Sequence, residues 1–395
     1  MTSAIGPNRP LLLSTVTIET VATFAGVAAL QSDYARILRV TGNTLPFALH
    51  EWHLTWCQHF LNCNPHIREE LNFYILRNAE RACVAILPFI ISRRRMGPLK
   101  IVSISLVGAD PAITEIRNPL VERGYEHLAV RTVRDSLSKV RDWDWIHWAG
   151  VNGDLAEALS AGGALQWQPP LSDFILDLPS TWEEFRSHLK RNIRESLRHC
   201  YNSLKRHGHE FELQVIEDPD GVRRGLDRYL ALHRMRAGLT DTVPHPDRFA
   251  SRICQDFLYA VCERLAARGA VRLFALKIGP DIVAMRLGFL VENALYLYYS
   301  GFDPTWSCYG VMTTTVAEAI KYAIAHGVKT VNLSPTQHVS KSRWRPRRVD
   351  YGSVYEPKDR LRSRLARSAY LTARSEGGNQ SKLLQRLITI RRIWN

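Results

Sequence analysis

The stretch from Leu295 to Gly327 has the order of features that can bind a phosphate group. "LYLYYSG" is predicted to be a strand rich in aromatic residues, and the residues after the loop "FDPTWSCYGVM" place apolar side chains on one helical face. Backbone N–H groups at such a helix N-terminus attract anions, and a glycine allows close approach. We therefore predict a phosphate-binding loop at Ser307, Cys308, Gly310 and Val311, with an ordinary strand-to-helix connection as the alternative.

A second group of polar residues follows the next predicted strand, "VKTVNLS". Imidazole titrates near neutral pH, so His338 is a candidate general base, and a histidine on a surface loop is the alternative. Lys341 and Arg343 would point the same way on an extended segment and could anchor an anionic group, or could be solvated charge. We place Lys341 with the catalytic candidates, and Arg343 and Trp344 with the substrate-binding candidates.

The elements that carry these residues follow an order that occurs twice. In the second half, "VRLFALKI", "IVAMRLGFLV" and "LYLYYSG" are strands joined by turns, followed by a helix and a last strand. In the first half, "LNFYILR", "ACVAILPFII" and "KIVSISLVG" precede the helix "EHLAVRTVRDSLSKVR" and the strand "WDWIHWAG". Two α/β units are therefore predicted.

Other segments complete the predicted organisation. A helix capped by Ser180 or Thr181 is predicted to run to about Arg206, and two more helices precede the second set of strands. We divide the chain into a peripheral segment (1–35), a first half (36–178), a second half (179–355) and a basic tail (356–395). The end of the tail fits a basic amphipathic helix that packs on the body or lies on anionic lipid.

Composition limits the class of protein. With 395 residues, 46% apolar and 23% charged, the chain is predicted to form two globular domains. The longest apolar runs reach about half of a membrane span, and no basic region precedes the N-terminal "LLL", so no secretory signal is predicted. The seven cysteines are scattered without a CxxC pair, which predicts neither a metal site nor a disulfide framework. A cytoplasmic location follows.

The net charge of +14 is concentrated in "FRSHLKRNIRESLRHCYNSLKR", "KSRWRPRR" and the tail. Such a field attracts a phosphorylated cofactor, an acidic carrier protein, an anionic membrane surface or RNA, with a solvated basic surface as the alternative. No nucleic-acid-binding module is recognised, so nucleic acid is not an expected partner unless the protein uses tRNA.

A longer resemblance covers about Leu45 to Gly352 and is strongest from Leu230 to Trp344. It is carried by "LHRMR", "RLFALKIG", "YLYYSGFDP", the spaced Lys-x-Arg-Trp and the entry segment "FALHEWHLTWCQHF". These pieces resemble the CelD-like proteins, GNAT-superfamily acyltransferases associated with cellulose biosynthesis and related to FemA, FemB and FemX. The resemblance implies tandem GNAT-like halves of α/β class, each a mixed, mainly antiparallel sheet flanked by helices.

The resemblance also implies an activity. A protein of this type would be an N-acyltransferase that moves an acyl group from a thioester of CoA or of an acyl carrier protein to an amine. Acetyl-CoA or acyl-CoA would be the co-substrate, without a metal, and the acceptor would be a small molecule, a peptide or a sugar. The predicted phosphate-binding loop would then hold the pyrophosphate of CoA.

Individual roles follow from the same resemblance. His338 would deprotonate the amine, Tyr309 would protonate the leaving thiolate, and the strand Ile282–Val291 would offer a backbone amide to the carbonyl oxygen. His233 would lie on the acceptor side, because the helix that carries it borders that side in GNAT-like folds. Tyr298 and Tyr299 alternate across a strand, so one of them would face the core and the other the cleft, and we take Tyr299 as the substrate-binding candidate. Packing in the core is the alternative for each of these side chains.

The sequence departs from the family at two places. The loop has Ser307, Gly310 and Met312 where the superfamily has a basic or amide residue and two glycines, and "NLSPTQHVSKSRW" lacks the acids of the usual Gly-Asp-Glu-Pro-Tyr-Lys run. Two alternatives therefore stay open. One is a Fem-like transferase that uses aminoacyl-tRNA, and the other is a degenerate, non-catalytic protein of polysaccharide assembly, peripheral at the inner face of the membrane.

Overall fold

The computed structural model describes residues 16–96, 99–108, 113–140, 142–239, 245–335 and 338–375. Its centre is one mixed sheet, in the order β1-β2-β3-β4-β6-β13-β7-β12-β11-β10-β9-β8, with β5 paired to β3. Two pairs, β4–β6 and β11–β12, are parallel, and all the others are antiparallel. The mixed, mainly antiparallel α/β architecture predicted from the sequence is confirmed.

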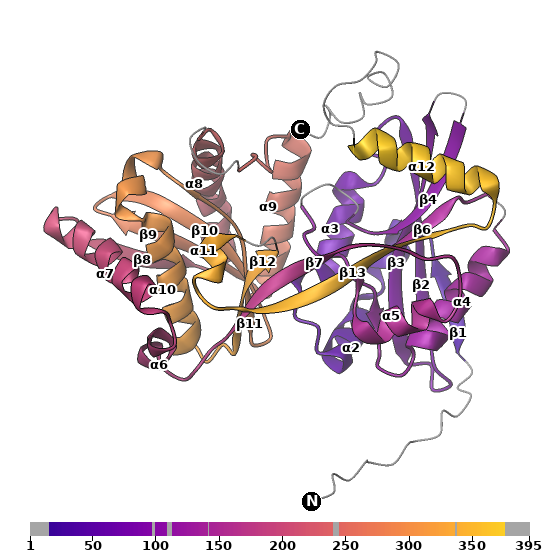
Figure 1. Cartoon of the computed structure of the whole chain (residues 1–395), viewed down its shortest axis with the longest axis horizontal. Helices are drawn as coiled ribbons and strands as arrows, with labels where there is room; N and C mark the ends of the chain where they lie inside the picture. The colour runs from indigo at the N-terminus through magenta and orange to yellow at the C-terminus, as the bar shows by residue number, and fades with distance from the viewer. Residues whose placement is uncertain are drawn as a thin grey trace, which may run out of the picture.

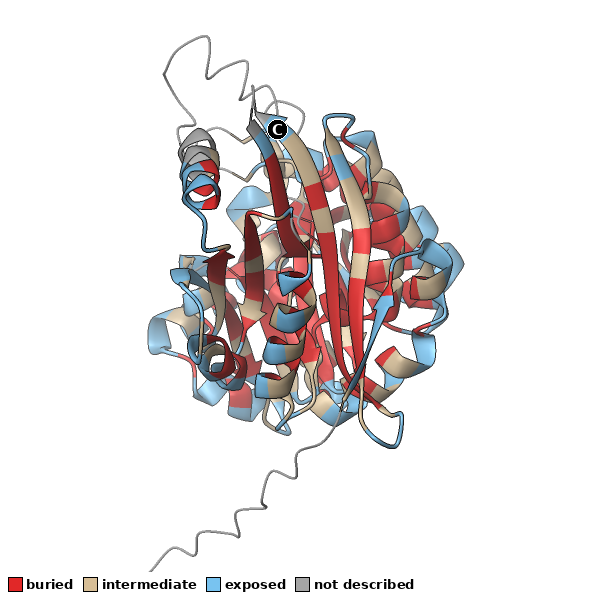
Figure 2. Cartoon of the chain, turned by 90° about the vertical axis from the view of Figure 1, so that its right-hand side faces the viewer, coloured by how far each residue is buried: buried red, intermediate tan, exposed pale blue. Residues whose placement is uncertain are grey.

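The first half forms the right-hand part of the molecule (Figure 1). Its strands are largely buried while its helices expose one side, as Figure 2 shows. The elements are β1 (Thr17–Val21), α1 (Phe24–Ala28), α2 (Gln31–Thr41), η1 (Pro46–Ala48), α3 (His50–Phe60), β2 (Ile67–Arg77), β3 (Cys83–Met96), β4 (Leu99–Leu106), β5 (Leu120–Val121), α4 (Glu126–Ser138), β6 (Trp145–Val151), α5 (Gly153–Ser160) and β7 (Gln166–Asp177).

The second half repeats the meander, helix and strand order. Its elements are α6 (Trp182–Ser187), α7 (Arg191–Arg206), β8 (Phe211–Ile216), α8 (Pro219–Ala237), α9 (Arg252–Ala267), β9 (Val271–Ile278), β10 (Asp281–Val291), β11 (Ala294–Phe302), η2 (Pro304–Tyr309), α10 (Val311–Ala325), β12 (Thr330–Pro335), α11 (Val339–Ser342), β13 (Arg347–Pro357) and α12 (Leu361–Ser375). The predicted duplication is present.

The two halves are joined by two long strands that cross the middle of the molecule (Figure 1). β7 ends the first half but pairs with β12 of the second, while β13 ends the second half but pairs with β6 of the first. β7 and β13 also pair with each other over most of their length. The sheet is therefore continuous. β7, from the first half of the chain, extends the strands of the second half, and β13, from the second half, extends those of the first.

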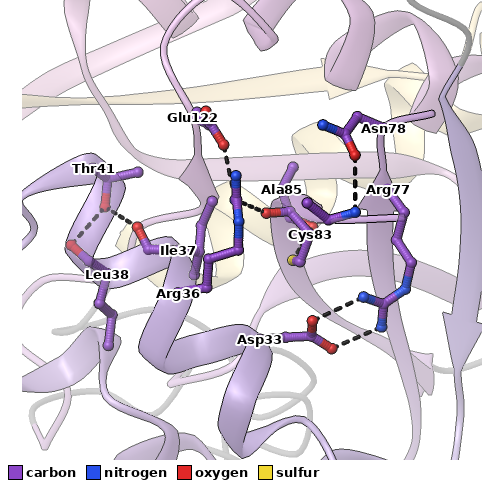
Figure 3. A network of polar contacts seen from close by, with 11 residues as sticks. Asp33, Arg36, Ile37, Leu38, Thr41, Arg77, Asn78, Cys83, Ala85 and Glu122 are labelled. Atoms are coloured by element: carbon purple, nitrogen blue, oxygen red, sulfur yellow. Dashed lines mark hydrogen bonds and ion pairs between the residues drawn. The ribbon is translucent and has the colours of Figure 1, made fainter. Parts of the chain in front are cut away.

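The segment 1–35 was predicted to be peripheral, and for its described part this is wrong. Tyr34 is buried and its hydroxyl lies 2.7 Å from His53 Nδ1. Asp33 accepts two hydrogen bonds from Arg77 of β2, at 2.8 and 2.7 Å (Figure 3). Figure 3 also shows Arg36 donating to Glu122 and to the carbonyl of Cys83. The segment closes the core of the first half because its apolar side chains cover the sheet.

The basic tail predicted at 356–395 is partly integrated into the fold. Its described part packs on the first half (Figure 1): Ser363 donates to Asp144, and Ala366 lies in a buried cluster with Trp145. Glu356, the second-last residue of β13, is buried. The predicted amphipathic helix at the end of the tail lies outside the described residues.

The helix predicted from Thr181 to Arg206 is two helices. Thr181 caps α6 as expected, accepting from the amide of Glu184 at 3.2 Å. Lys190 then adopts extended backbone, which separates α6 from α7, and Leu189 is buried in the core beneath α10. The break lets α7 lie along α10 with its cationic face exposed.

Candidate active site

A cavity opens where the parallel strands β11 and β12 separate. They pair at only three positions, from Ala294–Thr330 to Tyr296–Asn332, and then diverge. The resulting cavity has a volume of about 350 Å³. It is lined by Glu115, His233, Arg236, His245, Pro246, Arg248, Arg286, Tyr298, Tyr299, Ser300, Met312, Thr313, Val316, Leu333, Ser334, Pro335, His338, Ser340, Lys341 and Trp344.

The place of this opening corrects one sequence-based assignment. The strand Ile282–Val291 was expected to offer a free backbone amide, but β10 pairs with β9 on one side and β11 on the other. The free edges belong to β11 and β12 instead. A bulge in this pairing also changes the two tyrosines, which were predicted to face opposite ways: the rings of Tyr298 and Tyr299 lie 4.4 Å apart and both line the cavity.

One wall of the cavity is set by a close approach of α8 to β11. Gly301 has no side chain, and a Cβ there would lie 2.2 Å from the backbone nitrogen of His233. Because the helix lies directly on the strand, His233 Nδ1 reaches the carbonyl of Ser300 at 3.0 Å, while Nε2 accepts from the amide of Arg248 at 3.2 Å. Burial lowers the pKa of His233, so the imidazole is neutral at pH 7.

Lys341 projects from α11 toward the end of β12. Its ammonium donates to the carbonyl and hydroxyl of Ser334, both at 3.1 Å, and to the carbonyl of Pro335. Burial, with the nearby guanidinium of Arg286, lowers the pKa of Lys341 to about 8. The side chain thus holds the end of β12 that forms one edge of the opening. Its pKa lies closer to neutral pH than that of an ordinary lysine.

The first half contributes a carboxyl group, Glu115, from the connection between β4 and β5. Its Oε2 accepts from the hydroxyl of Tyr296 at 2.8 Å. Burial raises the pKa of Glu115 to about 7, against the opposing effects of the Tyr296 hydrogen bond and the Lys341 charge. A carboxylate that titrates near neutrality and lines a cavity has the properties of a general base.

A second carboxyl group, Asp173 of β7, lies close behind the cavity. It is fully buried, Oδ2 accepts from Asn332 at 2.7 Å, and Oδ1 has no hydrogen-bond partner among the described residues. Burial raises the pKa of Asp173 to about 6. The acids that the sequence lacks after Asn332 are therefore replaced in space by Glu115 and Asp173, which come from other parts of the chain.

The structure brings five of the predicted residues to this cavity: His233, Tyr299, His338, Lys341 and Trp344. Their individual roles stay predictions. His338 caps α11, and its Nδ1 accepts from the amide of Ser340 at 3.2 Å and lies 2.8 Å from the hydroxyl. The Nδ1 lone pair is thus engaged in capping α11.

Lys341 and Arg343 were predicted to point the same way on an extended segment, which is wrong because residues 339–342 are helical. Arg343 is not part of the cavity lining, and it donates to Ser196 of α7 at 2.7 Å and to the lining residue Thr313 of α10 at 3.2 Å. It therefore joins α7 to the N-terminal turn of α10.

The predicted phosphate-binding loop, with Tyr309, lies outside the lining of the cavity. Residues 304–309 form the 3₁₀ helix η2, in which the amide of Trp306 bonds Asp303 and that of Gly310 bonds Ser307. Val311 is buried, Tyr309 packs against His207, His209 and Trp306, and Gly310 lies beside Cys200. Of the four predicted loop residues, Gly310 already uses its amide in a bond to the carbonyl of Ser307 and Val311 is buried, and the pyrophosphate-binding role of the loop stays a prediction.

Several residues of the cavity were missed by the sequence analysis. Arg236 lies one helical turn after His233, so the i, i+3 spacing could have identified it. Arg286 is the one charged residue in the apolar run 282–291, which is unusual for a buried strand. Glu115 and Asp173 carry no local signal, because the fold alone brings them to the second half.

No cluster of His, Cys, Asp or Glu suited to a metal ion occurs in the described ranges. Within the same ranges, no helix combines the length and the apolar character needed to cross a membrane.

Comparisons with known proteins agree with this architecture. Residues 191–344 match the model of an acetyltransferase (GNAT) domain. The match confirms the prediction that the chain carries a GNAT-type acyltransferase domain. Among curated protein sequences none matches significantly.

Solved structures show the same fold over most of the chain. FemX is 13% identical, with a TM-score of 0.55 over 81% of this chain and 93% of that one. A conserved protein of unknown function from Bacteroides thetaiotaomicron is 13% identical, with a TM-score of 0.53 over 87% and 100%. The C-terminal domain assigned to a lysylphosphatidylglycerol synthetase from Agrobacterium fabrum is 11% identical, with a TM-score of 0.50 over 89% and 98%. The more specific resemblance to CelD-like proteins stays a prediction.

Proposed function

We propose that the protein transfers an acyl group from an activated thioester or ester to a primary amine bound in the cavity between β11 and β12. The observation that carries the proposal is Glu115. It is a carboxyl group with a pKa of about 7, held by the Tyr296 hydroxyl at the open edge of a GNAT-type domain. An amine nucleophile must lose a proton, and Glu115 is placed to accept it.

The reaction conserves atoms and charge. The amine nitrogen forms a bond to the acyl carbon, the bond from that carbon to sulfur or oxygen breaks, and the amine proton passes to Glu115. The proton held by Glu115 then passes, directly or through solvent, to the leaving thiolate or alkoxide, which restores the carboxylate. Lys341 keeps the end of β12 in place through Ser334 and Pro335, and its positive charge favours the ionised form of Glu115.

The identity of the donor is a separate part of the proposal. The GNAT match favours a CoA thioester, whereas FemX and the lysylphosphatidylglycerol synthetase suggest an aminoacyl ester as a second candidate. One observation favours that second candidate: the exposed face of α7 carries arginines and lysines that suit a larger polyanion.

The test is an assay of the full chain with acetyl-CoA, long-chain acyl-CoA and charged tRNA, each offered with a panel of primary amines. Formation of an N-acylated product, detected by mass spectrometry, is the expected result. Transfer from CoA thioesters or from tRNA identifies the donor. If no donor gives an amide product while a thermal-shift assay shows that donors bind, the proposed reaction is wrong.

A further inference from the structure

The cavity contains two guanidinium groups that have no carboxylate within ion-pair distance among the described residues, although the charge of Glu115 acts on one of them, Arg286. Arg236 of α8 donates to the hydroxyl of Ser300 at 2.6 Å and lies 2.9 Å from Nε2 of His245. Arg286 of β10 donates to the carbonyl of Leu297 at 3.1 Å, and its Nε has no partner. Among the described residues, neither arginine forms an ion pair.

Charge of one sign therefore accumulates in the cavity. The positive charges of Arg236 and Arg286 are close enough to affect each other: burial lowers the pKa of Arg286 to about 10, with Arg236 as the next contribution. Lys341 adds a third cation, and Glu115 is the one carboxyl group in the lining. Burial lowers the pKa of His245 to about 4, so this imidazole adds no charge at pH 7.

Keeping unpaired charges away from water destabilises a fold, so such groups usually have a partner. The interior contacts made by Arg236 and Arg286 are with a hydroxyl, an imidazole and carbonyls, which are neutral. A guanidinium binds a carboxylate or a phosphate with paired, charge-assisted hydrogen bonds. The missing partner is an anion, and the open cavity has room for one.

We propose that Arg236 and Arg286 form an anion subsite that holds a carboxylate or phosphate group of the amine acceptor. The acceptor class is then an amine that also carries an acid, such as an amino acid or a phosphorylated amino alcohol. Its amine would extend toward Glu115, which lines the same cavity. The role of the ligand as acyl acceptor rests on the proposed function, whereas the binding of an anion to the two arginines does not.

Binding is tested on the full chain by thermal shift and calorimetry with matched probes. One arm compares L-leucine and L-lysine with their amides, and the other compares phosphoethanolamine with ethanolamine. The anionic member of at least one pair is expected to bind at least tenfold more tightly, and the arm that responds identifies carboxylate or phosphate. Equal binding of the members with and without the acid group in both arms, or no binding in either, overturns the subsite.

Variants make the assignment specific. Arg286→Met and Arg236→Met are each expected to abolish the preference for the anion, whereas Arg234→Met should keep it, because Arg234 lies on the same helix and is exposed. Without ligand, Arg286→Met should melt at the same temperature as the wild type or higher, since it removes an unpaired buried charge. A large loss of stability together with an unchanged preference would show that the arginine is structural and overturn the proposal.

Binding and turnover fail separately. Anionic amines that bind but are never acylated would leave the subsite in place and contradict the proposed reaction. Amines without an acid group that are acylated as fast as those with one, with the rate unchanged in Arg286→Met, would support the reaction and contradict the subsite.

Discussion

Each half contains one pair of parallel strands, and the two pairs differ in what lies beyond their paired positions. β4 and β6 pair at three positions, from Ser103–Trp145 to Ser105–His147, just as β11 and β12 do. Beyond the paired positions of β11 and β12 lies a cavity, whereas the corresponding region of the first half is covered by its own chain. The repeated architecture thus provides one open site and one closed one.

The closure depends on a close backbone contact. A Cβ at Gly150 of β6 would lie 1.8 Å from the carbonyl oxygen of Arg117, and Thr114 lies against Gly108 just after β4. Ile113 and Ile116 are buried in the same segment. The segment that covers the first half also carries Glu115 into the cavity of the second. The segment that covers the first half therefore also supplies a carboxyl group to the cavity of the second half.

Three arginines of the first half and the two arginines of the cavity differ in their hydrogen-bond partners. In the first half, Arg36, Arg77 and Arg134 are partly buried and each pairs with a carboxylate. In the cavity of the second half, the hydrogen-bond partners of Arg236 and Arg286 among the described residues are neutral groups. Paired charges support a fold, whereas unpaired ones are a mark of a binding site.

The largest expected effect comes from replacing Glu115, the carboxyl group that the first half contributes to the cavity of the second half. Glu115→Gln should lower kcat/KM for acyl transfer about 100-fold or more, the usual contribution of a general base. Because the pKa of Glu115 is raised to about 7, the wild-type rate should fall as the pH drops below 7, and the variant should lose this dependence. Steady-state kinetics from pH 5.5 to 8.5 measure both.

Glu80→Gln is the matched control, since Glu80 is an exposed carboxylate of the same half. Its kinetics should equal those of the wild type. Retention of more than a third of the activity in Glu115→Gln would show that another group takes the proton.

The contrast between paired and unpaired cations predicts a difference in stability. Arg134→Met leaves Glu356 buried beside Trp148 without its cation, and should lower the free energy of unfolding by about 3 kcal/mol. Urea unfolding of Arg134→Met and Arg286→Met gives the comparison, and Arg134→Met/Glu356→Gln should recover part of the loss. Equal destabilisation by the two methionine variants would remove the distinction between the halves.

Asp173 lies on β7, the strand that pairs with β12 of the second half. From its raised pKa we expect the stability of the protein to depend on pH. Its folded pKa of about 6 is above the ordinary value of 3.8, so the folded state binds the proton more tightly than the unfolded state. Stability is therefore lost as the pH rises from about 4 to 6. Asp173→Asn should be more stable than the wild type at pH 8, by on the order of 2 kcal/mol.

The gain from Asp173→Asn should shrink toward zero near pH 4, where both side chains are neutral. Thermal melts at pH 4, 6 and 8 follow it. A variant that is less stable than the wild type at pH 8 would mean that the carboxylate is ionised and paired in the folded protein.

The smallest effect is expected for His338. Its Nδ1 already accepts from Ser340, so His338→Ala should change kcat by less than about threefold while slightly destabilising α11. The same kinetic assay measures it. A loss above tenfold, with the low-pH decline in rate also removed, would instead make the imidazole the base.

Residue patterns predicted the fold well because they are local. The alternation of strands and the helix at residues 311–325 follow from periodicity, and these elements carry several of the residues that line the cavity. The errors have local causes too: a bulge put Tyr298 and Tyr299 together, and a short helix separated Lys341 from Arg343.

The sequence by itself determined the repeated α/β units and the resemblance to a GNAT-type acyltransferase, since both depend on patterns within a short stretch of chain. Only the tertiary structure decided which half keeps an open cavity and which carboxyl groups serve it. Glu115 lies 181 residues from Tyr296, the residue whose hydroxyl holds it. Such a contact depends on how the two halves pack, and burial there, rather than the residue type, moves the pKa of Glu115 to neutral pH.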